Sequence, residues 1–270
     1  MPELPYRLCA IDLDDTLLGP DHTISERSLC AVQAVVACGA TVVLASGRMH
    51  EAMLRYIRQL ELTTPMISYN GAMVKNPLTG EEWLHERIRP ELAQIVMDFC
   101  QERDLQLNFY ANGVVNTVAY TPWMQLYHER TGCPYEIVPD LYTRMREVSP
   151  TKLIIVNTLE YTNSLLPVFR ERFGDALYIT KSTDEYLEFM PATANKGAAL
   201  ALIADHFGVA QESVLAFGDS YNDIPMLRWA GTGLAVGNAK PEVLVAADRI
   251  IGRYDEDGVA QALEEIYHLD

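Results

Sequence analysis

The stretch LCAIDLDDT, residues 8–16, decides the fold because it joins an apolar run to a cluster of acids. Its first part, residues 8–13, predicts a buried β-strand. Asp12 and Asp14 follow at the carboxyl end of this strand, which is where open parallel sheets bind their ligands. Strand periodicity directs both carboxylates to one side. An acidic turn that merely ends the strand is the alternative interpretation of this motif taken alone.

Beyond this stretch, helices and strands alternate. Ser25 is suited to begin a helix that runs to Cys38, and Gly39 is suited to end it. The pattern then predicts a strand at residues 41–45, a helix at 49–60 and a strand at 65–69. The same alternation returns after Pro191. This order predicts a parallel sheet with helices on its faces.

The pattern changes from about Trp83. A predicted helix at residues 90–103 precedes two strands joined by Asn112-Gly113, which is a hairpin signal. Further strands and one helix follow, and together they indicate a separate α+β module. We therefore predict a discontinuous, Rossmann-like α/β core over residues 1–82 and 188–270, with an α+β cap domain inserted at 83–187.

Composition restricts the class of partner. The chain has 270 residues, of which 49% are hydrophobic, so it can bury a sizeable core. Its formal net charge of -16 repels nucleic acids and anionic lipids, and we expect neither as a partner. The same charge repels small anionic substrates. A phosphate-binding site on this chain would therefore need its own cation.

The chain carries an odd number of cysteines, five, with no C-x-x-C pair, which favours reduced thiols in the cytoplasm. Residues 1–15 are too acidic for a signal peptide. The most apolar stretch, residues 29–45, is interrupted by Gln33 and Gly39 and predicts a helix followed by a strand. We therefore expect a cytoplasmic protein without a membrane span.

Two further motifs could bind phosphate. Ser46-Gly47-Arg48 follows the second predicted strand, where a hydroxyl and backbone N–H groups ahead of a helix can cradle a phosphate. Taken alone, this motif is better explained as an ordinary turn or helix cap, and only its position beside the Asp12 strand favours phosphate binding. Lys196 begins another predicted helix, although the helix dipole slightly disfavours a cation there. Its ammonium could neutralise phosphate charge, or it could simply be solvated.

The stretch GDSYND, residues 218–223, follows another buried strand and could bind a metal. Asp219 and Asp223 supply hard oxygen ligands of the kind that Mg²⁺ prefers. Helix capping would explain one acid, but not Asp219, Asn222 and Asp223 together. A phosphate loop of the form G-x-x-x-x-G-K-[ST], a dinucleotide fingerprint and a G-x-S-x-G elbow are all absent from the sequence.

In this order, the four motifs resemble those of the haloacid dehalogenase (HAD) superfamily, in particular its Cof-type branch of sugar-phosphate phosphatases. The motifs that carry the resemblance are Asp12-x-Asp14-x-Thr16-Leu17, Leu44-Ala45-Ser46-Gly47-Arg48, Asn195-Lys196-Gly197 and Phe217–Leu227. Asn70-Gly71-Ala72, residues 235–239 and residues 257–260 extend it.

The resemblance implies a magnesium-dependent phosphatase with a phospho-aspartyl intermediate on Asp12. Asp14 would transfer protons, and its backbone carbonyl would help to hold Mg²⁺. The implied phosphate ligands are Ser46, Gly47, Lys196 and Asn222, and the implied metal site comprises Asp12, Asp14 and Asp219, supported by Asp223. Asp15 departs from the family pattern, which has glycine there.

The implied substrates are small phosphorylated metabolites, with the cap domain setting specificity. A phosphotransferase or phosphomutase that uses the same aspartate is the alternative. A binding module that merely keeps the fold is disfavoured, because a sensor has no need for a nucleophile such as Asp12.

Overall fold

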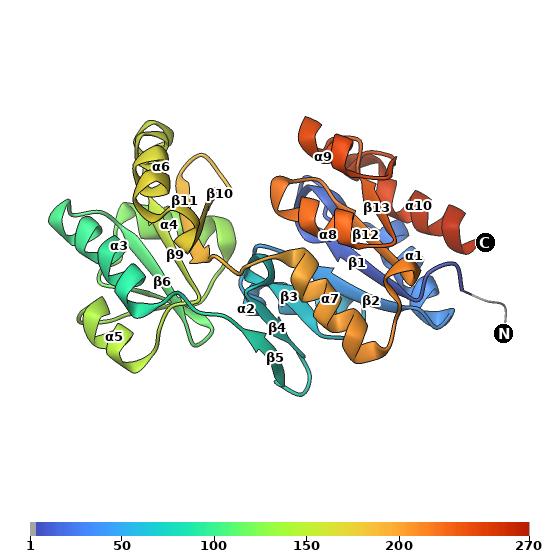
Figure 1. The fold of residues 1–270 in the computed structure, drawn as a ribbon, viewed down its shortest axis with the longest axis horizontal. Helices are drawn as coiled ribbons and strands as arrows, with labels where there is room; N and C mark the ends of the chain where they lie inside the picture. Colours follow the sequence, from blue (N-terminus) through green and yellow to red (C-terminus); the bar gives the residue numbers. More distant parts are fainter. Residues whose placement is uncertain (1–3, 270) are drawn as a thin grey trace. The chain divides into compact units, whose positions relative to one another are not determined.

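The computed structural model describes residues 4–269, and these residues form two compact units. One unit comprises the described chain up to Leu84 and again from Asn195, and the other comprises His85–Ala194 (Figure 1). Residues 1–3 and 270, which the predicted core range includes, lie outside the described part. The predicted boundary at residue 188 falls inside a strand that the second unit keeps whole, Tyr186–Pro191.

The first unit is built on an eight-stranded sheet in the order β14-β13-β12-β1-β2-β3-β4-β5. Its strands from β14 to β3 run parallel, and β4 pairs with β3 in antiparallel fashion. Their bounds are β1 (Leu8–Asp12), β2 (Thr41–Ala45), β3 (Met66–Ser68), β4 (Met73–Lys75), β5 (Glu82–His85), β12 (Val214–Gly218), β13 (Thr232–Ala235) and β14 (Arg249–Ile250).

Helices cover this sheet. All residues of β1 and β12 are buried, as expected for parallel strands that are covered on both faces. The predicted start of the first helix is confirmed, because the Ser25 side chain accepts a hydrogen bond from the backbone N–H of Ser28. The helices are α1 (Glu26–Ala37), α2 (His50–Gln59), α7 (Lys196–Phe207), α8 (Ile224–Trp229), α9 (Pro241–Ala246) and α10 (Gly258–Tyr267), with short turns η2 (Tyr69–Gly71), η4 (Gln211–Ser213), η5 (Tyr221–Asp223) and η6 (Tyr254–Glu256).

The second unit has a six-stranded sheet in the order β10-β11-β9-β6-β7-β8. The predicted hairpin is present, and both Asn112 and Gly113 have the positive φ that its turn requires. The elements are α3 (Pro90–Glu102), β6 (Leu107–Ala111), β7 (Val114–Thr117), α4 (Pro122–Thr131), β8 (Tyr135–Ile137), α5 (Leu141–Glu147), β9 (Lys152–Val156), α6 (Leu159–Phe173), η3 (Gly174–Ala176), β10 (Leu177–Lys181) and β11 (Tyr186–Pro191).

Strand order determines where the predicted site residues meet. β1 lies between β2 and β12, and all three run in the same direction, with Asp12 level with Ala45 and Ile11 level with Phe217. The loops that follow these strands therefore leave the same edge of the sheet. The predicted α/β fold with a parallel-sheet core is confirmed. Among the described residues, no helix is long and apolar enough to cross a membrane.

Candidate active site

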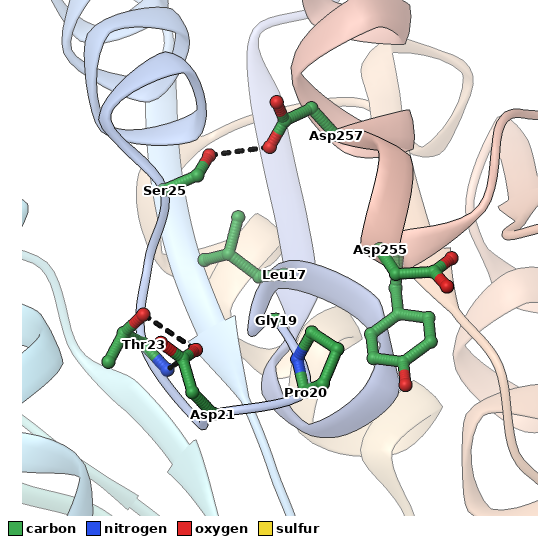
Figure 2. A pocket seen from close by; sticks show the side chains of 9 residues that line it. Leu17, Gly19, Pro20, Asp21, Thr23, Ser25, Asp255 and Asp257 are labelled. Atoms are coloured by element: carbon green, nitrogen blue, oxygen red, sulfur yellow. Dashed lines mark hydrogen bonds between the residues drawn. The ribbon is translucent and has the colours of Figure 1, made fainter.

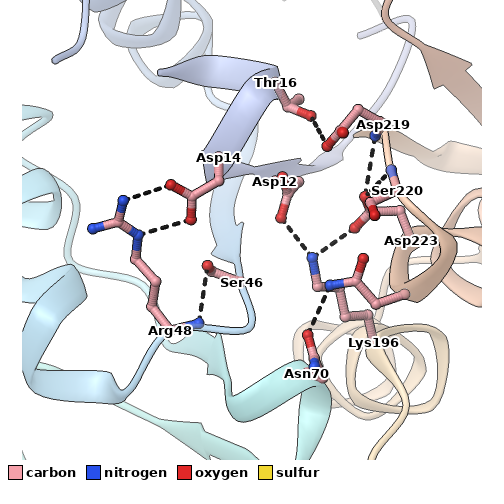
Figure 3. Close-up of polar contacts among 11 residues, drawn as sticks. Asp12, Asp14, Thr16, Ser46, Arg48, Asn70, Lys196, Asp219, Ser220 and Asp223 are labelled. Carbon is pink, nitrogen blue, oxygen red and sulfur yellow. Dashed lines mark hydrogen bonds and ion pairs between the residues drawn. The ribbon is translucent and has the colours of Figure 1, made fainter. Parts of the chain in front are cut away.

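Three buried acids converge at the carboxyl edge of the first sheet. Asp12 ends β1, Asp219 follows β12, and Asp223 ends η5 (Figure 3). One carboxylate oxygen from each residue lies within 4.8 Å of the others. Carboxylates this close and this buried repel one another, so the arrangement is stable only if protons or cations offset their charge.

Lys196 supplies one positive charge to this cluster. Its Nζ donates hydrogen bonds to Asp12 Oδ1 at 2.5 Å and to Asp223 Oδ1 at 2.6 Å, and its side chain is fully buried. Burial alone would lower the pKa of Lys196, but the charges of Asp12 and Asp223 outweigh this effect and raise it. Lys196 is therefore an ammonium, and it sits among three carboxylates.

This single ammonium leaves the cluster short of positive charge. Burial raises the pKa of Asp12 well above its ordinary value, and the charge of Asp223 adds to this effect while Lys196 opposes it. Burial and the charge of Asp223 likewise raise the pKa of Asp219 to about 7, although Thr16 Oγ1 donates a hydrogen bond to it at 3.1 Å. A divalent cation at this site would favour the ionised form of both acids.

Asp223 holds its loop in place. Its Oδ2 accepts the backbone N–H groups of Asp219 at 3.1 Å and Ser220 at 2.9 Å, and its Oδ1 accepts Lys196. A Cβ on Gly218 would lie 2.5 Å from the Cβ of Asp223, so only glycine fits there. Within residues 4–269, Oδ2 of Asp12 and Oδ2 of Asp219 accept no hydrogen bond. These two oxygens are therefore the ones best placed to bind a metal ion.

The loop after β2 carries the predicted phosphate ligands. Ser46 is buried, and its Oγ accepts the backbone N–H of Arg48 at 3.2 Å. Asn70 joins this loop to the loop after β12, because its N–H donates to Ser46 O at 3.0 Å and its Oδ1 accepts Asn222 Nδ2 at 2.7 Å. A Cβ on Gly47 would lie only 2.7 Å from this Oδ1.

Sequence reasoning assigned no role to Asn70, Thr16 or Arg48, although all three occur in the quoted motifs. The Asn70-Gly71 pair was the sequence signal that could have drawn attention to Asn70, because this pair favours a tight turn. Both residues do adopt positive φ in the structure. The close packing of this turn requires glycine, since a Cβ on Gly71 would lie 2.4 Å from the backbone of Asn195.

Asp14 lies apart from the acid cluster. Figure 3 shows its side chain turned toward Arg48, whereas Asp12 faces Lys196. The structure thus brings Asp12, Lys196, Asp219 and Asp223 together and directs the Asp14 carboxylate elsewhere. The neighbouring Asp15 has φ 55° and ψ 15°, a left-handed conformation that glycine adopts most easily. Its carbonyl accepts a hydrogen bond from Asn238 Nδ2 at 2.8 Å.

A separate pocket of about 320 Å³ lies beside the segment that follows Leu17 (Figure 2). It contains none of the predicted site residues, and Ser25 Oγ donates to Asp257 Oδ1 across it at 2.6 Å. Its lining consists of Leu17, Gly19, Pro20, Asp21, Thr23, Ser25, Tyr254, Asp255 and Asp257.

Known proteins match the chain over nearly its whole length. The family model of haloacid dehalogenase-like hydrolases matches residues 9–263. An HMP-PP phosphatase of Klebsiella pneumoniae is 30% identical over 88% of this chain and 86% of its own. A 5-amino-6-(5-phospho-D-ribitylamino)uracil phosphatase of Bacillus subtilis is 29% identical over 100% of both chains.

A solved structure agrees with these matches. The haloacid dehalogenase-like hydrolase from Bacteroides thetaiotaomicron superposes with a TM-score of 0.88 and 28% identity, covering 97% of this chain and 100% of its own. The resemblance noted in the sequence is thereby confirmed. This protein belongs to the haloacid dehalogenase-like hydrolase family.

Proposed function

We propose that the protein is a magnesium-dependent phosphatase that hydrolyses small phosphomonoesters through a phospho-aspartyl intermediate on Asp12. The contact between Asp12 and the buried ammonium of Lys196, at 2.5 Å, carries this proposal. A carboxylate at the end of a buried strand, beside a fixed cation and two further acids, has the surroundings of a nucleophile that attacks an anionic group.

The acid cluster fits a Mg²⁺ ion. Oδ2 of Asp12 and Oδ2 of Asp219 would bind it, with the backbone carbonyl of Asp14 as a further ligand, since Mg²⁺ prefers few carboxylates together with water and phosphate oxygens. When bound, the ion supplies the charge that offsets the repulsion between Asp12 and a phosphate dianion. Asp223 would act by holding Asp219 and Lys196 in place.

The proposed reaction has two steps. In the first, a carboxylate oxygen of Asp12 attacks phosphorus, the bond from phosphorus to the ester oxygen breaks, and Asp14 donates a proton to the departing alcohol. In the second, Asp14 takes a proton from a water molecule, which attacks the same phosphorus atom and restores Asp12 while inorganic phosphate forms. Lys196, the Ser46 hydroxyl, the Gly47 N–H and Asn222 would bind the phosphoryl oxygens.

The names of two relatives favour small phosphorylated metabolites as substrates. One is an HMP-PP phosphatase and the other a 5-amino-6-(5-phospho-D-ribitylamino)uracil phosphatase. The net charge of -16 is consistent with this class, because it disfavours nucleic acid substrates. We assign the choice among such metabolites to the second unit, His85–Ala194, as the cap domain.

Release of phosphate and p-nitrophenol from p-nitrophenyl phosphate tests this function. We expect equal amounts of both products with Mg²⁺, loss of activity in excess chelator, and recovery when Mg²⁺ is restored. The assay is repeated with added glycerol as an acceptor alcohol. If less phosphate than p-nitrophenol is released in the presence of glycerol, the phosphotransferase alternative is favoured. Full activity in excess chelator would exclude the proposed metal site.

A further inference from the structure

The Arg48 guanidinium donates two hydrogen bonds to the carboxylate of Asp14. Its Nε donates to Oδ2 at 2.8 Å, and its Nη2 donates to Oδ1 at 2.5 Å (Figure 3). Such a fork fixes both the place and the rotation of a carboxylate, because two parallel hydrogen bonds define a plane. Both oxygens of Asp14 are therefore engaged by Arg48, on the side facing away from Lys196.

Of the two partners, Arg48 is the better anchored. Its side chain is 20% exposed, whereas that of Asp14 is 40% exposed. The guanidinium carbon lies 5.5 Å from the centroid of the Tyr56 ring, and Tyr56 is itself buried and donates a hydrogen bond to the backbone oxygen of His22 at 3.1 Å. A cation over an aromatic ring gains further attraction. If the pair opens, Asp14 is the side chain that can move.

The backbone of Arg48 also belongs to the proposed phosphate-binding loop. Its N–H donates to Ser46 Oγ at 3.2 Å, and its carbonyl oxygen accepts the N–H of Tyr69 at 2.9 Å. One residue thus holds the proposed proton carrier with its side chain while its main chain shapes the loop that would hold phosphate. Its position connects the two functions.

We propose that Arg48 is a positioning residue that holds the ionised Asp14 carboxylate in a resting orientation. When a phosphoryl group is bound, Asp14 turns away from Arg48, takes a proton from solvent and donates it to the leaving alcohol. The proton that Asp14 then takes from the attacking water returns to solvent when the ion pair with Arg48 re-forms. This inference rests on the proposed function, because it takes Asp14 to be the proton carrier. It makes Arg48 act on the reaction through Asp14 and not by contact with the substrate. The ion pair is then a feature of the resting enzyme, and it opens when a phosphoryl group is bound.

A double-mutant cycle tests whether Arg48 acts through Asp14. Arg48→Gln is measured in the wild-type protein and in Asp14→Asn, with p-nitrophenyl phosphate and Mg²⁺. We expect Arg48→Gln to change kcat by about fivefold or more when Asp14 is present, by less than about twofold in Asp14→Asn, and to leave KM within about twofold in both. Equal changes in both backgrounds, a change in KM alone, or no change in either would overturn the proposal.

Arg55 provides the matched control. Its guanidinium carbon also lies over the Tyr56 ring, at 4.5 Å, and it contacts the Tyr56 hydroxyl, but within residues 4–269 it forms no hydrogen bond or ion pair with Asp14. We expect Arg55→Gln to leave kcat and KM unchanged. If Arg48→Gln does not fold, Arg48→Lys replaces it, because lysine retains the positive charge but lacks the planar guanidinium. We expect Arg48→Lys to change kcat less than Arg48→Gln does, and again only in the protein that contains Asp14.

A crystal structure with Mg²⁺ and beryllium fluoride tests whether the orientation is a resting one. We expect at least one of the two Arg48–Asp14 hydrogen bonds to be broken, with Asp14 turned toward the fluoride group. Retention of both bonds would overturn the resting orientation. The two proposals fail in different ways. If the proposed function is wrong, the wild-type protein has no phosphatase activity. If only the Arg48 proposal is wrong, the wild-type protein is active and the effects of Arg48→Gln and Asp14→Asn on kcat are additive.

Discussion

Lys196 and Asp12 lie 184 positions apart in the sequence, yet Lys196 Nζ donates a hydrogen bond to Asp12 Oδ1 at 2.5 Å. The contact forms because α7 begins at the same edge of the sheet where β1 ends. Asn195 caps that helix by accepting the N–H groups of Gly197 and Ala198, which fixes Lys196 in the first turn. The ammonium is thus part of the structural core as well as of the proposed site.

Lys196→Met removes this cation and leaves Asp12 and Asp223 buried without their partner. We expect the free energy of unfolding in urea, without Mg²⁺, to fall by about 3–5 kcal/mol, as for other broken buried ion pairs. Lys75→Met is the control, because Lys75 pairs with Glu82 at 3.4 Å in a partly exposed position. That change should cost about 1 kcal/mol or less, and equal losses for the two variants would contradict this account.

Asp14→Asn retains the size of the side chain but cannot transfer protons. We expect kcat to fall by about 10²–10⁴-fold, with Mg²⁺-dependent thermal stabilisation preserved because the acid cluster does not include the Asp14 side chain. Steady-state kinetics with an alkyl phosphate and with p-nitrophenyl phosphate will show the larger loss for the alkyl ester, whose leaving group needs the proton more. Wild-type rates in this variant would remove Asp14 from the mechanism.

Stabilisation by Mg²⁺ should depend on pH. The pKa of Asp219 is raised from 3.8 to about 7 by burial and by Asp223. Between these values the folded protein holds a proton that the unfolded chain has released, so the metal-free protein loses stability as the pH rises from about 4 to about 7. Cation binding requires the ionised acid and offsets this loss.

We therefore expect saturating Mg²⁺ to raise the Tm more at pH 8 than at pH 5. At about 100 times Kd the ion stabilises the folded state by about 2.7 kcal/mol. The Asp219→Asn variant, measured by the same calorimetry, should show little shift at either pH. A wild-type shift that is equal at both pH values would mean that the acid cluster does not bind the ion.

Asp15 occupies a left-handed conformation, with φ 55°. We expect Asp15→Gly to remain within about 1 kcal/mol of the wild-type stability, because lower strain and higher unfolded-state entropy oppose each other. Asp15→Val should lose about 1–2 kcal/mol, since a β-branched side chain fits this conformation poorly. Thermal unfolding of the two variants measures the difference, and equal stability would show that the loop relaxes.

Strongly patterned elements could be predicted from the sequence. The predicted strand at residues 41–45 matches β2, the predicted helix at 90–103 matches α3 to within one residue, and the helix predicted to begin at Lys196 begins there as α7. The prediction missed α4, of which only Met124 and Tyr127 are buried, and β8, whose residues are all exposed. Weakly buried elements carry no apolar period, so their residues give no signal.

The start of the predicted cap domain also shows what sequence reasoning lacks. The change in pattern at Trp83 placed it in the inserted domain, but Trp83 belongs to β5 at the edge of the first sheet. Its ring stacks on that of His206 in α7, with centroids 3.7 Å apart. This partner lies far away in the sequence, and no local pattern at Trp83 indicates it.

The candidate site, like the fold, could be predicted from the sequence only in part. Asp12, Asp219 and Asp223 could be placed together from sequence, because neighbouring parallel strands end at one edge. The orientation of the Asp14 side chain could not, since it depends on Arg48 and on the packing of that arginine against Tyr56. Strand ends follow from pattern, whereas side-chain directions follow from contacts made in the folded chain.

Asp12→Asn tests the central claim most directly, with Asp15→Asn as the matched change in a neighbouring acid outside the cluster. Phosphate release from p-nitrophenyl phosphate is measured with saturating Mg²⁺, after calorimetry has shown that both variants are folded. We expect Asp12→Asn to release no phosphate above background and Asp15→Asn to keep most of the wild-type rate. Wild-type turnover by folded Asp12→Asn would contradict the assignment of Asp12 as the nucleophile.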